Sequence, residues 1–133
     1  MIMRTVELTL LAAVIAFALD MGIGVAAPPL TAVPRDFPPF TFLPILSGTV
    51  GGTILASLVY SILRASVAVP DRAFLFLTLA VFTLSLALPL RLSFTRSPRF
   101  AGVTPAAQMA LVLMHAVVAT VSLIALTSQT ARR

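Results

Sequence analysis

The 133-residue chain contains no cysteine and no tryptophan, and it has a single histidine and a single tyrosine. The lack of cysteine excludes disulfide exchange, thiolate catalysis and iron–sulfur ligation by this chain. Charged residues are scarce as well: they make up 10% of the sequence, against 59% hydrophobic residues and a mean hydropathy of +1.10. Soluble domains do not have this composition. We therefore predict a membrane protein.

The net charge of +5 comes from nine basic residues, all of them arginine, against four acidic ones. These arginines are scattered through predicted loops and termini and form no basic face, so we expect no nucleic-acid binding. The lipid bilayer and its anionic headgroups are the simpler partners. Arg91, Arg96 and Arg99 lie close together beside Phe94 and Phe100, and they are candidates for headgroup contact or for ordinary anchoring at the interface.

Four apolar stretches are long enough to cross a bilayer as helices, which takes about 20 residues each. They cover residues 6–27, 42–63, 73–90 and 105–127. Their short connections predict an all-α polytopic membrane protein, an antiparallel bundle of four transmembrane helices that forms one domain over residues 1–133. We expect the first stretch to be retained as a span rather than cleaved as a signal peptide, because Asp20 interrupts it.

The segment between the first two predicted spans, residues 28–44, contains six prolines and three phenylalanines. Proline lacks the N–H group that a helix interior needs, so we expect this segment to end the first helix and to run outside the core as a loop. Its phenylalanines are expected at the interface as a partial cap. Further along, we expect Asp71 to cap the third helix, and Thr104 and Pro105 to begin the fourth as its N-cap and first residue.

An even number of spans places both termini on one side of the membrane. If that side is cytoplasmic, five arginines face inward and four face outward. The inward set is Arg4, Arg64, Arg72, Arg132 and Arg133. This bias is small but follows the positive-inside rule, so we predict a multi-pass protein of the cell (inner) membrane with cytoplasmic termini.

Each predicted span carries one small or polar face. Gln108, His115 and Ser122 recur every seven residues in the fourth span, and Thr78 and Ser85 do so in the third. This spacing stacks each set along one side of its helix. Lipid offers polar groups no hydrogen bonds, so we expect these faces to meet inside the bundle.

Small residues mark the second span, where Gly48, Gly52 and Ala56 form a GxxxG pattern extended by one turn. Patterns of this kind allow two helix backbones to approach closely. We therefore predict that these three residues pack against a neighbouring helix.

Asp20 and His115 are ionisable residues placed deep inside predicted spans. Helix rise puts them about 10 Å and about 15 Å from the same membrane surface, within reach of a direct or water-mediated contact. The protonation of such a pair is coupled. Two interpretations stay open, namely a proton-linked or ligand-binding site in a small cavity, and a polar clasp that fixes helix register. The candidate residues are Asp20, His115, Gln108, Ser122, Ser85 and Thr78.

Three stretches resemble a family of uncharacterised bacterial four-span integral membrane proteins, a domain of unknown function. They are GTVGGTILASLVYSILR in the second span, LSLALPL at the end of the third and LVLMHAVVA in the fourth. The resemblance covers most of the chain and implies the four-span architecture but no activity. The family-type positions it implies are Gly48, Gly52, Ser85, Pro89 and His115, with Asp20 where a polar residue is expected.

The sequence shows no reactive constellation, because it has no cluster of metal ligands and no base for its serines other than His115. We therefore predict a non-enzymatic interaction or accessory subunit without a cofactor, working as a homo-oligomer or in a larger membrane complex.

The alternative is a small proton-coupled transporter that acts as an oligomer. It would be similar in size to the small multidrug resistance carriers, which also have four short spans and an acidic residue in the first. The lack of tryptophan removes the aromatic box of those carriers. A third interpretation is haem or quinone binding, where haem would need a dimer or a methionine such as Met21 or Met114 to supply the second ligand. A fourth is an intramembrane hydrolase built on Ser85 and His115.

Overall fold

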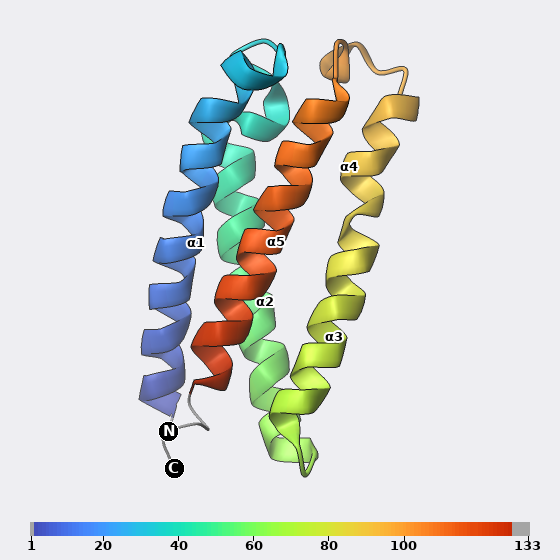
Figure 1. Cartoon of the computed structure of the whole chain (residues 1–133). Helices are drawn as coiled ribbons and strands as arrows, with labels where there is room; N and C mark the ends of the chain where they lie inside the picture. Colours follow the sequence, from blue (N-terminus) through green and yellow to red (C-terminus); the bar gives the residue numbers. More distant parts are fainter. Residues whose placement is uncertain (1, 129–133) are drawn as a thin grey trace.

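The computed structural model describes residues 2–128 as a bundle of helices joined by short loops. Each helical span runs antiparallel to the span that precedes it (Figure 1). The spans are α1 (Ile2–Thr31), α2 (Phe42–Ser66), α3 (Pro70–Ser85) continued by α4 (Ala87–Arg91), and α5 (Pro105–Thr127). The loops contain the 3-10 helices η1 (Pro38–Phe40), η2 (Leu92–Phe94) and η3 (Pro98–Phe100). No strand occurs between residues 2 and 128, and the predicted all-α antiparallel bundle is confirmed.

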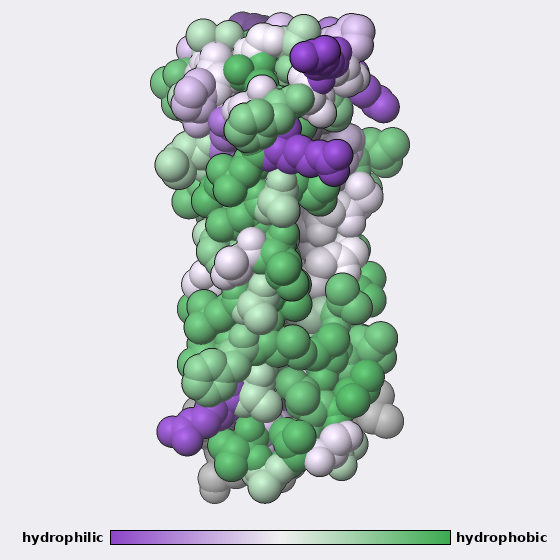
Figure 2. Space-filling view, turned by 90° about the vertical axis from the view of Figure 1, so that its right-hand side faces the viewer, coloured by the Kyte–Doolittle hydropathy of each residue, from purple (hydrophilic) through white to green (hydrophobic). Residues whose placement is uncertain are grey.

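Four helical segments of the bundle are long and apolar enough to cross a membrane. They are Met3–Thr31, Phe42–Ser66, Pro70–Phe94 and Pro105–Thr127. Large apolar side chains are exposed along all of them, and Figure 2 shows an apolar surface between more hydrophilic ends. In a bilayer this surface lies against lipid, which makes the chain a polytopic membrane protein.

The first helix continues past its predicted end at residue 27. That boundary is wrong, because Pro28 and Pro29 lie inside the last turns of α1. Each proline removes one helix hydrogen bond, but its ring also holds φ near the helical value. The last turn keeps a substitute bond, since the hydroxyl of Thr31 donates to the carbonyl oxygen of Ala27 at 2.7 Å.

The chain leaves α1 through Ala32, which has a left-handed backbone with φ of +57°. Helices commonly end in this conformation, and glycine usually occupies it because a Cβ atom is crowded there. We expect Ala32→Gly to raise the free energy of unfolding by roughly 1 kcal/mol. Unfolding by SDS in mixed micelles, followed by far-ultraviolet circular dichroism, measures this change.

The control for that substitution is Ala80→Gly, at an exposed position within α3. There glycine should lower the free energy of unfolding by about 0.5–1 kcal/mol, because it only weakens a helix. A destabilising effect of glycine at both positions would contradict backbone strain at Ala32.

The third span, predicted over residues 73–90 as one helix, is interrupted between α3 and α4 at Leu86. Pro89 explains the interruption, because it has no N–H group for the carbonyl oxygen of Ser85 four residues earlier. The far end of the span is capped from α5. The side-chain nitrogen of Gln108 donates to the carbonyl oxygens of Pro89 and the next residue, at 2.9 and 3.3 Å.

The fourth predicted span matches α5 at both ends, and its predicted N-cap is confirmed. The hydroxyl of Thr104 accepts a hydrogen bond from the N–H of Ala107 at 3.1 Å, with Pro105 in the first turn. The same hydroxyl donates to the carbonyl oxygen of Thr31 at 2.7 Å. Thr104 therefore ties the start of α5 to the end of α1.

The predicted role of Asp71 as the cap of the third helix is wrong. The N-cap position of α3 is Val69, which makes no side-chain cap bond. Asp71 instead accepts a hydrogen bond from the hydroxyl of Tyr60 at 2.6 Å. Tyr60 is buried in a cluster with Phe74 and Leu126 that closes the bundle near the turn between α2 and α3.

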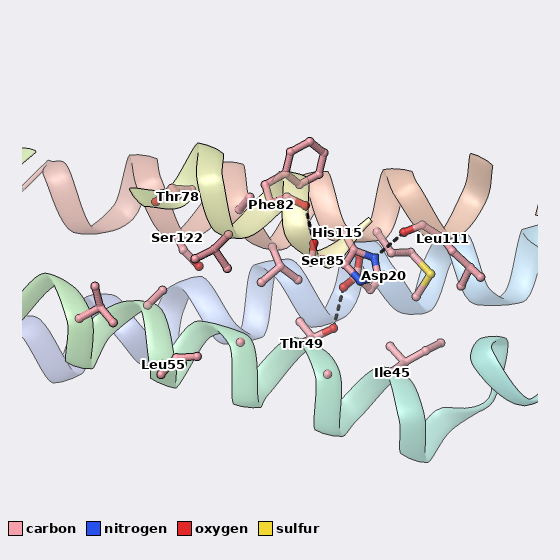
Figure 3. A pocket seen from close by; sticks show the side chains of 18 of the residues that line it. Asp20, Ile45, Thr49, Leu55, Thr78, Phe82, Ser85, Leu111, His115 and Ser122 are labelled. Carbon is pink, nitrogen blue, oxygen red and sulfur yellow. Dashed lines mark hydrogen bonds between the residues drawn. The ribbon is translucent and has the colours of Figure 1, made fainter. Parts of the chain in front are cut away.

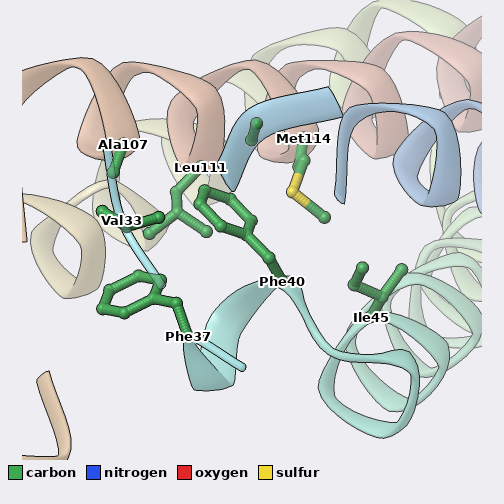
Figure 4. Packing of buried hydrophobic residues seen from close by; sticks show 8 residues of the cluster. Val33, Phe37, Phe40, Ile45, Ala107, Leu111 and Met114 are labelled. Atoms are coloured by element: carbon green, nitrogen blue, oxygen red, sulfur yellow. The ribbon is translucent and has the colours of Figure 1, made fainter. Parts of the chain in front are cut away.

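The proline-rich segment folds over the opposite end of the bundle. Phe37 and Phe40 are 2% and 5% exposed and belong to a core cluster with Leu111 and Met114 (Figure 4). The expectation that all these phenylalanines lie at the interface is therefore wrong, because two of them form a buried plug. Only Phe42 is well exposed, at 57%.

The third span is packed less tightly than the others. Helices α1, α2 and α5 contact one another, and α3 lies against α2 and α5. The buried residues of this span are Phe74 in α3 and Pro89 in α4, at its opposite ends. Between those two positions the described span has no buried residue, which leaves space beside α2 and α5.

Candidate functional site

A cavity of about 470 Å³ occupies the space between α2, α3 and α5, and α1 contributes one residue to it. This volume lies within the range of small-molecule sites, about 300–1,000 Å³. Most of the wall is apolar, and the described lining includes no arginine. The polar lining residues are Asp20, Thr49, Thr78, Ser85, His115 and Ser122.

The cavity opens toward the outer surface between α2 and α3. Leu55 of α2 and Leu77 of α3 line it, yet they are also 57% and 40% exposed. Gly48 and Val81 likewise belong to both the lining and the exposed surface. Because this surface lies within the spanning segments, the opening faces the lipid bilayer.

Asp20 is the acidic residue of the cavity, and its side chain is 1% exposed. Its Oδ2 atom accepts a hydrogen bond from the hydroxyl of Thr49 at 2.6 Å (Figure 3). Its Oδ1 atom is buried and has no hydrogen-bond partner in the described chain. A buried polar atom without a partner costs on the order of 1–3 kcal/mol, so Oδ1 is an unused acceptor.

His115 enters the same cavity from α5. The Nδ1 atom lies 2.7 Å from the carbonyl oxygen of Leu111, one turn earlier. A carbonyl oxygen only accepts, so Nδ1 carries the hydrogen of this bond. In the neutral ring, Nε2 then keeps a lone pair and is a second acceptor.

The structure thus places Asp20 and His115 on the same cavity. Because α1 ends at Thr31 rather than at residue 27, Asp20 lies about 16 Å from that end by helix rise, deeper than predicted and close to the depth of His115. The direct contact considered from the sequence is absent, since Asp20 bonds to Thr49 and His115 to its own helix. The polar contact that joins two helices here is therefore the hydrogen bond between Asp20 of α1 and Thr49 of α2.

A second polar level lies about two turns away along the same cavity. Ser122 is seven residues from His115, about 10 Å along α5, and its buried hydroxyl has no hydrogen-bond partner in the described chain. Because α3 runs antiparallel to α5, Ser85 lies near the level of His115 and Thr78 near that of Ser122 (Figure 3). Apolar side chains separate the two levels.

One predicted site residue, Gln108, is wrongly assigned, because it does not line the cavity. It lies about 10 Å from His115 along α5, toward the N-terminal end of that helix. There its side-chain nitrogen donates a hydrogen bond to a carbonyl oxygen at the end of α4. The other predicted residues all line the cavity. They are Asp20, His115, Ser122, Ser85 and Thr78.

The predicted packing surface on α2 is only partly right. A Cβ atom at Gly52 would lie 3.2 Å from the Cγ1 atom of Val118, so α2 does approach α5 closely there. At Gly48 a Cβ atom would meet nothing within 4 Å, and both Gly48 and Ala56 line the cavity. The role of Gly48 in close packing is therefore wrong, because it faces open space.

Thr49 is a site residue that was not predicted from the sequence. It lies in a charge-free span four residues before Thr53, and both threonines are buried. Two polar residues one turn apart are a signal for an inward face. Which acceptor they meet depends on how α2 is rotated against α1.

No reactive pair is assembled in the cavity. The hydroxyl of Ser85 donates to the carbonyl oxygen of Phe82 at 2.7 Å, and His115 bonds to Leu111, so Ser85 and His115 are not bonded to each other. Between residues 2 and 128, no group of three histidine, cysteine, aspartate or glutamate residues is placed to hold a metal ion.

The fold and this cavity define a class of protein, a four-span helical membrane protein with an acidic residue in an intramembrane cavity. No family model, no curated protein and no solved structure matches the chain. The resemblance to uncharacterised bacterial four-span proteins therefore stays a prediction.

Proposed function

We propose that the chain is a non-enzymatic membrane protein that binds an amphipathic small molecule between α2, α3 and α5. One observation carries this proposal. The two buried side-chain atoms that lack a hydrogen-bond partner between residues 2 and 128 are Asp20 Oδ1 and Ser122 Oγ, and both residues line the same cavity. Buried polar groups are normally paired, so these two fit a ligand that supplies the missing partners.

The rest of the wall supports a ligand with an apolar body. Its apolar side chains come from three helices, and the cavity opens to lipid between Leu55 and Leu77. A molecule dissolved in the bilayer can enter by this route without crossing water. Ligand capture from lipid suits an accessory subunit that works as a homo-oligomer or within a larger membrane complex.

Leucine at position 48 tests the proposal, because Gly48 lines the cavity and a Cβ atom there meets nothing within 4 Å. We expect the wild-type protein in nanodiscs to bind tritiated dodecanol or dodecylamine saturably, above the uptake of empty nanodiscs. Gly48→Leu should weaken this binding about tenfold or more, because the added side chain occupies the volume that the ligand needs.

The matched control is Gly51→Leu on the same helix. A Cβ atom at Gly51 also meets nothing within 4 Å, but this residue does not line the cavity. Binding should be unchanged in this variant. Equal effects of the two leucines, or no saturable binding of either probe by the wild-type protein, would contradict the proposed function.

We further propose the cell (inner) membrane, with cytoplasmic termini. Support comes from the arginine count of five against four, which includes Arg132 and Arg133, outside the described residues. Arg91, Arg96 and Arg99 are all exposed, and they lie at the end of α4 and in the connection from α4 to α5. Their position beside the spanning segments fits contact with anionic lipid headgroups.

A proton-coupled transporter acting as an oligomer is the second candidate. It is favoured by the placement of Asp20 and His115 on one cavity, because ionisable residues inside spans often serve proton movement. Proton-driven uptake of the probes into proteoliposomes would separate this carrier from a protein that only binds.

A further inference from the structure

We infer that the cavity selects a protonated amine carried on an apolar body, an inference that rests on the proposed ligand binding. The amine would lie between Asp20 Oδ1 and His115 Nε2, and the apolar body would extend along α5 toward Ser122.

Every side-chain donor at the Asp20 level is already bonded. The hydroxyl of Thr49 donates to Asp20, Nδ1 of His115 donates to a backbone carbonyl, and the hydroxyl of Ser85 donates to another. With the carboxyl group ionised and the imidazole ring neutral, the atoms left over are Asp20 Oδ1 and His115 Nε2, and both accept. A ligand must therefore bring donors to this level. A protonated primary amine has three, whereas an alcohol has one and a carboxylate none.

Charge favours the same ligand. Asp20 is the one formally charged residue in the described lining of the cavity, and no arginine balances it there. An ionised carboxylate in an apolar wall is costly unless it is paired. A cationic ligand neutralises the carboxylate, a neutral ligand leaves it unbalanced, and an anionic ligand repels it.

The second unpaired atom limits the shape of the ligand. Ser122 lies about 10 Å along α5 from His115, and Val118 and Phe82 are among the apolar lining residues of the cavity. An amine held at Asp20 therefore places its next several carbon atoms against an apolar wall. A second polar group about 10 Å from the nitrogen would reach the unpaired hydroxyl of Ser122.

Dodecylamine and dodecanol test this selectivity, because they share an alkyl chain and differ in the polar end. With the full chain in nanodiscs near neutral pH, we expect dodecylamine to bind about tenfold or more tightly than dodecanol, after correction for uptake by empty nanodiscs. Asp20→Asn should weaken dodecylamine binding by about tenfold or more and leave dodecanol binding nearly unchanged. Asparagine keeps the shape of the side chain but removes its charge.

The matched control is Glu7→Gln, which removes an acidic residue from an exposed position of the same helix, outside the cavity lining. It should change neither affinity. If the wild-type protein binds both probes equally and Gly48→Leu abolishes both, the amine selectivity is overturned while the proposed function stands. If neither probe binds saturably, both are overturned. Should Asp20→Asn fail to fold, the ratio of the two wild-type affinities decides.

Discussion

Phe37→Ala should lower the free energy of unfolding by about 3 kcal/mol, which is the usual cost of removing a buried phenylalanine ring. Phe37 is 2% exposed and belongs to the buried cluster that the proline-rich segment forms with Leu111 and Met114 of α5. Its ring centroid lies 5.5 Å from that of Phe40 and 6.4 Å from that of Phe100. Alanine would leave a cavity at the point where the proline-rich segment meets α5.

Unfolding in SDS mixed micelles, followed by circular dichroism, is the suitable measurement because the chain has no tryptophan for fluorescence. Phe94→Ala is the control, since Phe94 is 84% exposed. Its loss should change the free energy of unfolding by no more than about 0.5 kcal/mol. Similar effects at both positions would show that Phe37 does not form the plug.

Thr49→Val should lower the free energy of unfolding by about 2 kcal/mol. Valine has nearly the shape of threonine, so packing is retained while the 2.6 Å hydrogen bond to Asp20 is lost. Asp20 would then have no hydrogen-bond partner for either carboxyl oxygen, in a position that is 1% exposed. The same unfolding measurement tests this expectation.

Two variants separate the lost hydrogen bond from other effects of valine. Thr49→Ser keeps the hydroxyl group and should recover more than half of the stability. Thr83→Val changes an exposed threonine whose hydroxyl only bonds within its own helix, to the carbonyl oxygen of Leu79, and should have little effect. If Thr49→Ser is as unstable as Thr49→Val, the bond to Asp20 is not what stabilises the pair of helices.

Some helix boundaries followed from local sequence and others did not. The start of α5 was predictable because Thr104 and Pro105 act within a single turn, through a side-chain cap and a fixed φ. The end of α1 was not predictable from local sequence, because Pro28 and Pro29 fall in the last turns, where a helix tolerates the loss of two hydrogen bonds. The break at Leu86 was not predictable either, because the sequence suggested that Pro89 ends the helix, whereas the chain breaks three residues before it and continues as α4 to Arg91.

The candidate site was predictable in the same partial way. The depth of His115 followed from helix rise, because the start of α5 was predicted correctly. The depth of Asp20 was underestimated, because α1 continues past residue 27 to Thr31. The hydrogen-bond partner of Asp20 did not follow from the sequence, because a rotation of α2 by one residue about its axis would replace Thr49 with a different side chain. Gln108 shared the seven-residue spacing of the site residues, yet its side-chain nitrogen donates to a carbonyl oxygen at the end of α4 and does not reach the cavity.

The amino-acid sequence alone determined that the chain forms four membrane-spanning helices and how far apart the polar side chains of one helix lie along its axis, because hydropathy and helix rise are local properties. Only the tertiary structure decided that the third span leaves a cavity where it packs against α2 and α5, and that Asp20 Oδ1 and Ser122 Oγ border this cavity without hydrogen-bond partners. Helix rotation and spacing decide these features, and they arise from packing between segments far apart in the chain.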